Sequence, residues 1–419
     1  MVSRKKILFV TYGGGHANIV DLIAEEILAR GDLDFKILAL TSALDQLTPS
    51  YPDGSVSGIS EYSFLFNDCI EEVHSIGKTM LASNYNPKFS KEESIWYLGL
   101  SMYDLIQTHG RERAYADYKK FGRKCFKPVD TISKILKFEK PDVLFTTTSP
   151  RFEEASILAA SLLGIPTVQL LDLFGDVSPR PSADHIVVMN KNVEEQLRSR
   201  GITKPKIKIF GQPAIEKTVR SIQSCDRDAL RKSLKIQPQE KVLLFASQRL
   251  VACNENLEII SNIPYNLIYD KLFPIFREMH ERYGIIFLLR THPNEDLCEY
   301  SDYLKDFKFI KHVNGTLNLE ESLSISDILL TKTSTVGVEA AAAGMTVLTY
   351  MHDYDIGYSV PNYKVAPYIF SNGFRELTTN LHAVIPSIGA RIASPRHFIE
   401  SDCVGKTVSL LTELAQNGI

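Results

Sequence analysis

The chain has 419 residues, a formal net charge of −3, 44% hydrophobic residues and 23% charged residues. This length is enough for two or three domains, and the composition is that of a globular enzyme rather than a disordered chain. The lack of excess positive charge argues against nucleic-acid binding through phosphate neutralisation. The six cysteines form no CxxC pair, which argues against a structural zinc site or a disulfide framework and fits a reducing cytoplasm.

The start of the chain combines basic residues with the apolar run Ile7–Val10, which Gly13 follows closely. This run is far shorter than a signal core, and no apolar stretch reaches the roughly 20 residues that span a bilayer. We expect a cytoplasmic protein and leave open a peripheral contact with the inner face of the membrane.

The first half of the chain repeats a short apolar run, a Gly/Ser/Thr turn and a helical period, which is typical of βαβ units on a parallel sheet. The predicted strands are 6–12, 35–40, 143–146, 165–171 and 186–189, and the predicted helices are 19–29 and 152–163.

The second half repeats the pattern after Gly211-Gln212-Pro213. The predicted strands are 241–245, 285–289, 307–310, 327–330 and 346–350, and the predicted helices are 265–283 and 338–343.

These patterns predict an α/β protein with two Rossmann-like domains facing a cleft. We expect an N-terminal domain over residues 1–212, a second domain over 213–395, and a C-terminal helix within 396–419 that packs back on the first domain. Residues 50–130 fit the pattern poorly, and we interpret them as a mostly helical insertion in the first domain. A role in acceptor recognition and a role in packing are equally open for this insertion.

A glycine-rich turn, Gly13-Gly14-Gly15-His16, lies between the first predicted strand and helix. Glycine allows a ligand to approach the backbone, and the following helix offers unpaired N–H groups. The turn is not a GxGxxG fingerprint, so the dinucleotide motif does not apply. We predict that His16 contacts a substrate, while a capping or purely structural histidine stays open.

Arg290, Thr291, His292 and Pro293 directly follow a predicted strand. Arg290 and His292 are suited to binding phosphate, and Pro293 stops the strand after them. His292 as a structural histidine at a strand end remains the alternative.

Hydroxyl groups of Thr333, Ser334 and Thr335 precede a predicted helix that contains Glu339 and four alanines. Such a turn is suited to a phosphate, and a carboxylate in the first turns of the helix could accept both hydroxyls of a ribose. A capping contact between Glu339 and Thr335 is the structural alternative.

A weaker polar cluster follows the strands of the first domain. It comprises Thr147-Thr148-Ser149-Pro150-Arg151, Glu153, Glu154, Asp172 and Asp176. Such groups could bind acceptor hydroxyls or supply a general base.

These motifs resemble the two-domain glycosyltransferases of the GT-B fold. ILFVTYGGGH and LLTKTSTVGVEAAAAGMTVLTY look like the glycine-rich loop and the donor segment of the N-acetylglucosaminyltransferases that complete lipid II. That resemblance implies that Glu339 binds the ribose of a nucleotide. SADHIVVMNKNVEEQLRSRGITKPKIKIFGQP resembles the end of their first domain.

A second resemblance concerns RTHPNE and, about 40 residues later, TSTVGVEA. This pair is similar to the His-Pro and Ser-Thr motifs of capsule-type Kdo transferases and bacterial sialyltransferases. It implies that His292, Ser334 and Thr335 hold the phosphate of a CMP-sugar. The nucleotide base of the donor therefore stays open between uridine and cytidine.

From these patterns we expect a glycosyltransferase that moves a sugar from a UDP- or CMP-sugar to a hydroxyl of a glycan or lipid-linked acceptor, in bacterial surface polysaccharide synthesis. The expected donor residues are Ser247, Gln248, Arg249, Arg290, His292, Thr333, Ser334, Thr335 and Glu339. The expected acceptor loop is Gly13, Gly14 and Gly15, and the expected base is His16, with Asp172 or Glu153 in reserve.

No DxD-like pair stands out at a convincing strand end, so we expect neither a metal nor another cofactor. The alternatives are an epimerase or hydrolase of the UDP-N-acetylglucosamine 2-epimerase type, whose Arg-Pro-Glu turn is missing here, and a non-catalytic sugar-nucleotide binding protein. The sequence does not indicate an oligomeric state.

Overall fold

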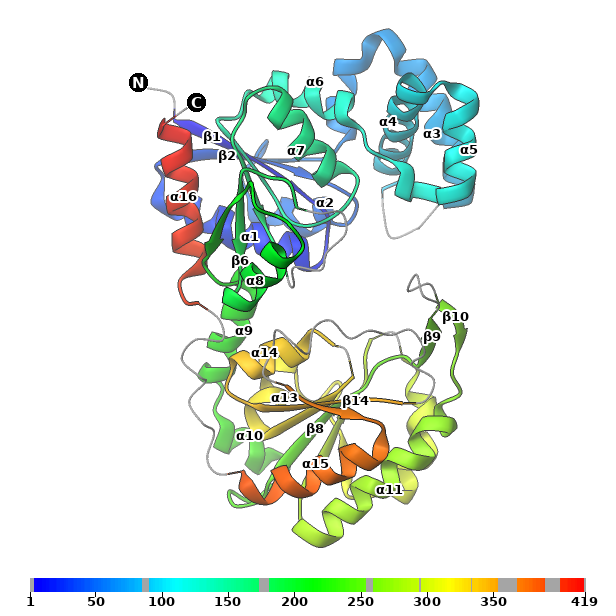
Figure 1. The fold of residues 1–419 in the computed structure, drawn as a ribbon, viewed down its shortest axis with the longest axis vertical. Coiled ribbons are helices and arrows are strands. Elements are labelled where there is room, and N and C mark those ends of the chain that lie inside the picture. Colours follow the sequence, from blue (N-terminus) through cyan, green and yellow to red (C-terminus); the bar gives the residue numbers. More distant parts are fainter. Residues whose placement is uncertain are drawn as a thin grey trace. The chain divides into compact units, whose positions relative to one another are not determined.

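The protein was analysed as a computed structural model that describes residues 4–84, 90–172, 181–253, 259–293, 295–332, 334–352, 368–388 and 400–417. The chain forms two compact units (Figure 1). Unit 1 comprises Met1–Ala214 and Glu400–Ile419, and unit 2 comprises Ile215–Ile399.

Unit 1 contains a parallel seven-stranded sheet with the order β3-β2-β1-β4-β5-β6-β7. Its strands are β1 (Lys5–Thr11), β2 (Leu33–Ala39), β3 (Val56–Ser57), β4 (Val143–Thr146), β5 (Thr167–Leu170), β6 (His185–Val188) and β7 (Lys206–Ile209). The chain moves outward from β1 to β3 and then restarts on the other side of β1 at β4. This reversal of strand order between β1 and β4 is the switch point at which doubly wound sheets bind ligands.

Helices α1 (Gly15–Arg30), α2 (Ala43–Leu47), α7 (Phe152–Leu162) and α8 (Lys191–Ser199) connect these strands. The insertion consists of η1 (Thr48–Ser50), η2 (Ser60–Cys69), α3 (Ile70–Asn84), α4 (Lys91–His109), α5 (Arg111–Phe121), η3 (Gly122–Cys125) and α6 (Val129–Glu139). The prediction of a mostly helical insertion is therefore confirmed, and the short strand β3 is an addition to it.

Two glycines allow α3 and α4 to pack with their backbones in close contact. A Cβ atom at Gly77 would lie 2.1 Å from the carbonyl oxygen of Ile95, and one at Gly99 would lie 2.3 Å from that of Val73. No other residue type fits at these contacts without a shift of a helix. Within the insertion, α3 and α4 thus form a specifically packed pair of helices. Their buried residues belong to the same core as those of β1 and α7.

The last helix, α16 (Cys403–Asn417), belongs to unit 1 and packs against α1 and β1. Its apolar residues Val408 and Leu411 are fully buried in the core that contains the β1 side chain of Phe9. Where the chain re-enters unit 1, Gly211 has a φ of 104°, and a Cβ there would lie 2.4 Å from the carbonyl oxygen of Glu400. Glycine is therefore required at that crossing.

Unit 2 contains a parallel six-stranded sheet with the order β12-β11-β8-β13-β14-β15. Its strands are β8 (Val242–Ala246), β11 (Ile286–Arg290), β12 (Ile310–His312), β13 (Ile328–Thr331), β14 (Thr346–Met351) and β15 (Tyr368–Asn372), and a separate hairpin pairs β9 (Val251–Cys253) with β10 (Ile259–Asn262). The strand order again reverses beside the first strand, between β8 and β13. This is the Rossmann order with a second switch point.

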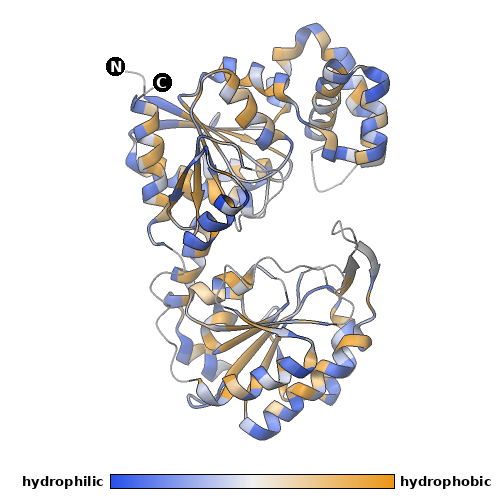
Figure 2. Ribbon diagram, viewed as in Figure 1, coloured by the Kyte–Doolittle hydropathy of each residue, from blue (hydrophilic) through white to orange (hydrophobic). Residues whose placement is uncertain are grey.

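The helices of unit 2 are α9 (Pro213–Ser224), which begins at the end of unit 1, α10 (Arg227–Ser233), α11 (Tyr265–Tyr283), α12 (Ser301–Asp306), α13 (Leu319–Ile325), α14 (Val336–Ala342) and α15 (Phe374–Ser387), with the short η4 (Leu297–Tyr300). The central strands of both sheets are strongly hydrophobic (Figure 2), as expected for strands covered by helices on both faces.

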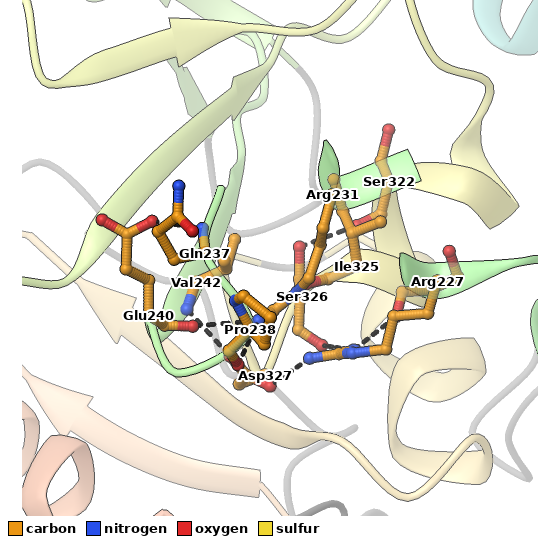
Figure 3. A network of polar contacts seen from close by, with 11 residues as sticks. Arg227, Arg231, Gln237, Pro238, Glu240, Val242, Ser322, Ile325, Ser326 and Asp327 are labelled. Atoms are coloured by element: carbon orange, nitrogen blue, oxygen red, sulfur yellow. Dashed lines mark hydrogen bonds and ion pairs between the residues drawn. The ribbon is translucent and has the colours of Figure 1, made fainter. Parts of the chain in front are cut away.

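A buried ionic network holds α10 against the amino ends of β8 and β13 (Figure 3). Asp327 accepts hydrogen bonds from Arg227 Nη2 at 2.5 Å, Arg231 Nη2 at 2.9 Å and the backbone N–H of Val242 at 2.8 Å. Arg231 also donates to the carbonyl oxygens of Ile325, Pro238 and Glu240. The two guanidinium groups share the Asp327 carboxylate, and together with the backbone contacts of Arg231 they hold α10 at the end of the sheet opposite to its carboxyl ends.

The predicted α/β architecture with two Rossmann-like domains is confirmed. Most predicted elements lie within one or two residues of those observed, and α11 has the predicted bounds. The predicted strand 307–310 is displaced, because the observed β12 begins at Ile310 and residues 308–309 form a turn. The elements β7, β15 and the β9–β10 hairpin were not predicted.

Candidate functional site

The predicted residues of unit 1 meet at the switch point of its sheet. Strands β1 and β4 are paired in register from Ile7 with Val143 to Val10 with Thr146, so their carboxyl ends lie side by side. The loop Gly13–His16 follows β1, and the loop Thr147–Arg151 follows β4. Two segments about 130 residues apart thus form one polar edge of the sheet.

The three glycines of the first loop differ in what makes glycine suitable at each position. A Cβ atom at Gly13 would lie 1.9 Å from Ser42 Oγ, and Gly14 has a φ of 72°, so the fold itself requires glycine at both positions. A Cβ atom at Gly15 would meet no atom within 4 Å. Packing does not explain Gly15, whereas the close approach of a ligand to the start of α1 would.

His16 is tied to the second loop by both of its ring nitrogens. Its Nδ1 lies 2.8 Å from Thr147 Oγ1, and its Nε2 lies 3.3 Å from Ser149 Oγ. The His16 side chain is half-buried, so part of the ring remains accessible. A histidine fixed in this way at a switch point is placed to exchange a proton with a bound hydroxyl.

Glu153 lies beneath this histidine and is fully buried. Its carboxylate accepts hydrogen bonds from the hydroxyl of Thr147 and from the backbone N–H groups of Ser149, at 2.9 Å, and Tyr12, at 3.3 Å. Burial raises the pKa of Glu153 from its ordinary value to about 8, and the nearby charge of Asp172 acts in the same direction. Because the side chain has no exposed surface, Glu153 can influence a reaction only through its neighbours.

Asp172, the other reserve base, is half-buried after β5. It accepts a hydrogen bond from the hydroxyl of Thr148, and its carbonyl oxygen accepts one from Gln212 Nε2 at 3.0 Å. Asp172 therefore belongs to the same strand edge as His16 but is bonded to another side chain. Asp176 lies outside the described residues.

A buried pair of tyrosines lies next to the carboxyl end of β1. Tyr12 follows β1, and its hydroxyl oxygen lies 3.1 Å from that of Tyr97 on α4. The guanidinium of Arg151 lies 5.2 Å from the centre of the Tyr12 ring. Arg151 has a φ of 73°, which is strained for a residue with a side chain, and its Nε is buried without a hydrogen-bond partner among the described residues.

The predicted residues of unit 2 lie on the carboxyl ends of three adjacent strands. Ser247 follows β8, Arg290 ends β11, and Ser334 follows β13, in the sheet order β11-β8-β13. The three motifs that the sequence separates by up to 90 residues therefore share one sheet edge at the second switch point.

Glu295 is the centre of the hydrogen bonds at this edge. Its carboxylate accepts from Ser247 Oγ at 2.6 Å, Tyr265 Oη at 3.0 Å, Tyr300 Oη at 2.8 Å and the backbone N–H of His292 at 2.8 Å. Glu295 thus fixes the loop after β11. In the sequence, its only signal is an acid three residues after His292, and this spacing predicts no role for it.

The predicted phosphate ligands of this loop differ in their surroundings. Arg290 donates through Nη1 to the carbonyl oxygen of Leu317 at 2.9 Å and to Ser322 Oγ at 3.3 Å, and burial lowers its pKa. Part of its guanidinium therefore anchors the start of α13, and phosphate binding would depend on its other N–H groups. His292 is exposed beside it.

Near the carboxyl end of β13, Glu339 has a side-chain oxygen without a hydrogen-bond partner among the described residues. Its Oε2 is buried and accepts no hydrogen bond from any described residue. Burial raises the pKa of Glu339 to about 7, and the neighbouring carboxylate of Glu320 adds to the effect. The side chain of exposed Thr335 makes no capping bond, so the capping alternative for this pair is not observed.

Ser334 Oγ accepts a hydrogen bond of 3.4 Å from the backbone N–H of Val336 at the start of α14. Thr333 lies outside the described residues.

Gln248 and Arg249 continue from Ser247 toward the β9–β10 hairpin. Arg249 is exposed and donates through Nη2 to Asn262 Oδ1 at 2.8 Å. It also lines a cavity of about 1000 Å³ whose other charged residues are acids, namely Asp270, Asp296, Glu299, Asp302 and Asp306. These carboxylates would repel an anionic ligand, so this cavity is less suited to a phosphate than the strand ends near Glu339.

Among the described residues, no group of three His, Cys, Asp or Glu side chains is arranged to hold a metal ion. In the same part of the chain, no helix is both long and apolar enough to cross a bilayer.

No family model matches the sequence. No curated protein matches it either.

Several solved structures share the fold over nearly the whole chain. UDP-GlcNAc 2-epimerase from Methanocaldococcus jannaschii matches with a TM-score of 0.60 and 16% identity, covering 97% of this chain and 99% of the epimerase. MurG from Acinetobacter baumannii matches with a TM-score of 0.56 and 11% identity, covering 98% and 100% of the two chains. UDP-GlcNAc 2-epimerase from Neisseria meningitidis, solved with UDP-GlcNAc bound, matches with a TM-score of 0.54 and 14% identity, covering 98% and 100%. At these identities the similarity establishes the fold alone, and that fold is the GT-B type.

Proposed function

We propose that the chain is a glycosyltransferase that transfers a sugar from a UDP- or CMP-sugar to a hydroxyl of a glycan or lipid-linked acceptor, as in the synthesis of bacterial surface polysaccharides. The observation that carries nucleotide binding is the buried Oε2 of Glu339 at the switch point of unit 2, which has no hydrogen-bond partner in the described part of the chain. A ribose diol offers two hydroxyl donors to such a carboxylate. The GT-B fold, shared with structures that include MurG, supports the proposal.

Transfer requires a base for the acceptor hydroxyl and stabilisation of the leaving nucleotide. His16 supplies the base, because its ring is fixed by Thr147 and Ser149 at the switch point of unit 1. Arg290, His292 and Ser334 are the proposed groups for the departing phosphate. The reaction is proposed to need no metal, and loss of turnover on adding a chelator would contradict that part.

A second candidate is a nucleotide-sugar 2-epimerase or the related hydrolase. The observation that favours it is the similarity to UDP-GlcNAc 2-epimerase structures over nearly the entire chain. Both activities use the same nucleotide site, so they differ only in what happens to the sugar.

A thermal-shift panel with UDP, CMP, GDP, TDP and CDP tests the shared step. A nucleotide at 100 times its Kd raises the unfolding free energy by about 2.7 kcal/mol. We expect UDP or CMP to stabilise the protein selectively, Glu339→Gln to remove the shift, and Glu281→Gln, at an exposed position of α11, to keep it. If no nucleotide raises the melting temperature of the wild-type protein, the nucleotide-sugar proposal is wrong.

A further inference from the structure

A continuous set of hydrogen bonds joins a buried carboxyl group to the accessible histidine of unit 1. Glu153 Oε1 and Oε2 lie 3.0 and 2.9 Å from Thr147 Oγ1, and Thr147 Oγ1 lies 2.8 Å from His16 Nδ1. Thr147 and Glu153 are both fully buried, so water does not compete at these contacts. Among the described residues, the Thr147 hydroxyl links Glu153 to Nδ1 of His16, whereas Ser149 contacts Glu153 through its backbone N–H and the other ring nitrogen, Nε2, through its Oγ.

The Thr147 hydroxyl has a single hydrogen, so it cannot donate to both neighbours. If Glu153 is ionised, it accepts that hydrogen, and the Thr147 oxygen accepts from His16 Nδ1–H. The lone pair of the imidazole is then on Nε2. If Glu153 is protonated, it donates to the Thr147 oxygen, and the hydroxyl donates to a bare Nδ1, which leaves the ring proton on Nε2.

We propose that Glu153, acting through the Thr147 hydroxyl, determines which ring nitrogen of His16 carries the proton and is a positioning residue for that histidine. Ionised Glu153 makes His16 a base at Nε2, and neutral Glu153 makes it a donor there. The tautomer is a property of the free protein. Its catalytic meaning rests on the proposed function.

In the transfer reaction, the base form is the productive one. The acceptor hydroxyl gives its proton to His16 Nε2 while its oxygen attacks the anomeric carbon. The bond from that carbon to the phosphate oxygen breaks, and its electron pair leaves with the nucleotide. The imidazolium that forms donates from Nδ1 to Thr147, whose hydroxyl donates to the Glu153 carboxylate, so the new charge is balanced without direct contact.

The groups around Glu153 place this change near neutral pH. Burial, assisted by Asp172 after β5, raises the pKa of Glu153 to about 8, while the N–H groups of Ser149 and Tyr12 oppose the rise. Arg151 at the start of α7 is the facing cation. Helix α6 packs on α7 with apolar side chains such as Ile135.

The test is the tautomer of His16, read from ¹⁵N shifts of a protein with labelled histidine between about pH 6 and about pH 10. His16→Gln identifies the signal. We expect neutral His16 to change from the Nε2–H to the Nδ1–H form as the pH rises through about 8, where Glu153 ionises. Glu153→Gln should show one tautomer throughout, because the amide side chain does not titrate in this range.

The remaining variants separate the relay from a general effect on folding. Thr147→Val should abolish the pH-dependent change, and Thr147→Ser should restore it. Glu154→Gln on the same helix, whose side chain pairs with Lys127 at 2.6 Å, should behave as wild type. A wild-type His16 that keeps one tautomer over this range, or the same change in Thr147→Val as in wild type, would overturn the proposal. Neither result depends on nucleotide binding, so this proposal and the proposed function fail separately.

Discussion

Glu339 combines a buried oxygen that accepts no hydrogen bond from a described residue with a pKa raised to about 7, so the proposed nucleotide binding should depend on pH. Ribose hydroxyls donate to the ionised carboxylate, and protonation replaces one acceptor by a donor. Below about pH 7 the affinity for a nucleotide-sugar should therefore fall about tenfold per pH unit, the cost of deprotonating the group before binding. A nucleotide-sugar is the suitable ligand because its diester phosphates do not titrate in this range.

Titration calorimetry from about pH 5.5 to about pH 8 measures this dependence. Glu339→Gln should bind more weakly at high pH, with an affinity that hardly changes with pH, and Glu281→Gln should follow the wild-type curve. An undiminished pH dependence in Glu339→Gln would assign it to another group.

Glu153 should also make the stability of the protein depend on pH. A carboxyl group whose pKa is raised by folding binds its proton more tightly in the folded state. Its contribution is full below the ordinary value of 4.5 and is lost as the pH rises through about 8. Between these limits the wild-type protein should lose up to about 5 kcal/mol of unfolding free energy relative to Glu153→Gln.

Urea unfolding at about pH 5 and about pH 9 gives the comparison. Glu154→Gln serves as the control, since it lies on the same helix but pairs with Lys127. A Glu153→Gln protein whose stability changes with pH as wild type does would contradict the buried, raised carboxyl.

At the scale of secondary-structure elements, the α3–α4 pair depends on two glycines. Gly99→Ala would press a methyl group against the carbonyl oxygen of Val73, which lies only 2.3 Å from the ideal Cβ position. We expect a loss of about 1–3 kcal/mol, because the contact is with backbone that cannot rotate away. Gly15→Ala, whose Cβ enters open space, should change the stability by less than about 0.5 kcal/mol in the same thermal unfolding experiment. Equal effects of the two substitutions would refute the close helix contact.

In unit 2, the packing of a helix depends on the network around Asp327, which holds α10 against β8 and β13. Arg231→Met removes one of the two α10 cations that bind Asp327 and leaves this carboxylate with one fewer partner, for an expected cost of about 3 kcal/mol. Arg220→Met, which breaks an exposed pair with Glu216 on α9, should cost less than about 0.5 kcal/mol. Thermal unfolding of both variants decides the point, and an Arg231→Met protein as stable as Arg220→Met would show that the buried network contributes little.

At the scale of the whole molecule, the two-domain fold could be predicted from the sequence. The apolar strands and the turns after them predict two Rossmann-like domains, because buried parallel strands leave a local hydrophobic signal. The same pattern places His16 and Thr147 together at the carboxyl ends of the strands of unit 1. In unit 2 it places Ser247 and Ser334 together in the same way. The edge strand β15 was missed, and β7 with its Lys-Ile-Lys-Ile sequence has too little apolar character to stand out.

The chemistry of the individual site residues was less visible. Nothing local indicates that Glu153 is fully buried while adjacent Glu154 pairs with Lys127 at the surface. The role of Glu295 depends on Tyr265 and Tyr300, which reach it from other elements. Such roles arise from tertiary contacts, and spacing in the sequence does not record them.

The central claim is transfer of a sugar, and proton NMR of the reaction in D₂O tests it most directly. The donor that the nucleotide panel selects is followed with and without added glycan acceptor. Transfer predicts that the nucleotide is released only when the acceptor is present. If the selected donor is a UDP-linked aldose, a new anomeric signal should accompany the release, and the sugar should keep its C2 proton. A CMP-linked sugar of the Kdo type has no proton at its anomeric C2, so for that donor transfer is read from acceptor-dependent release of the nucleotide. Loss of the donor without acceptor, with deuterium appearing at C2, requires removal of that proton and would contradict the transferase in favour of the 2-epimerase.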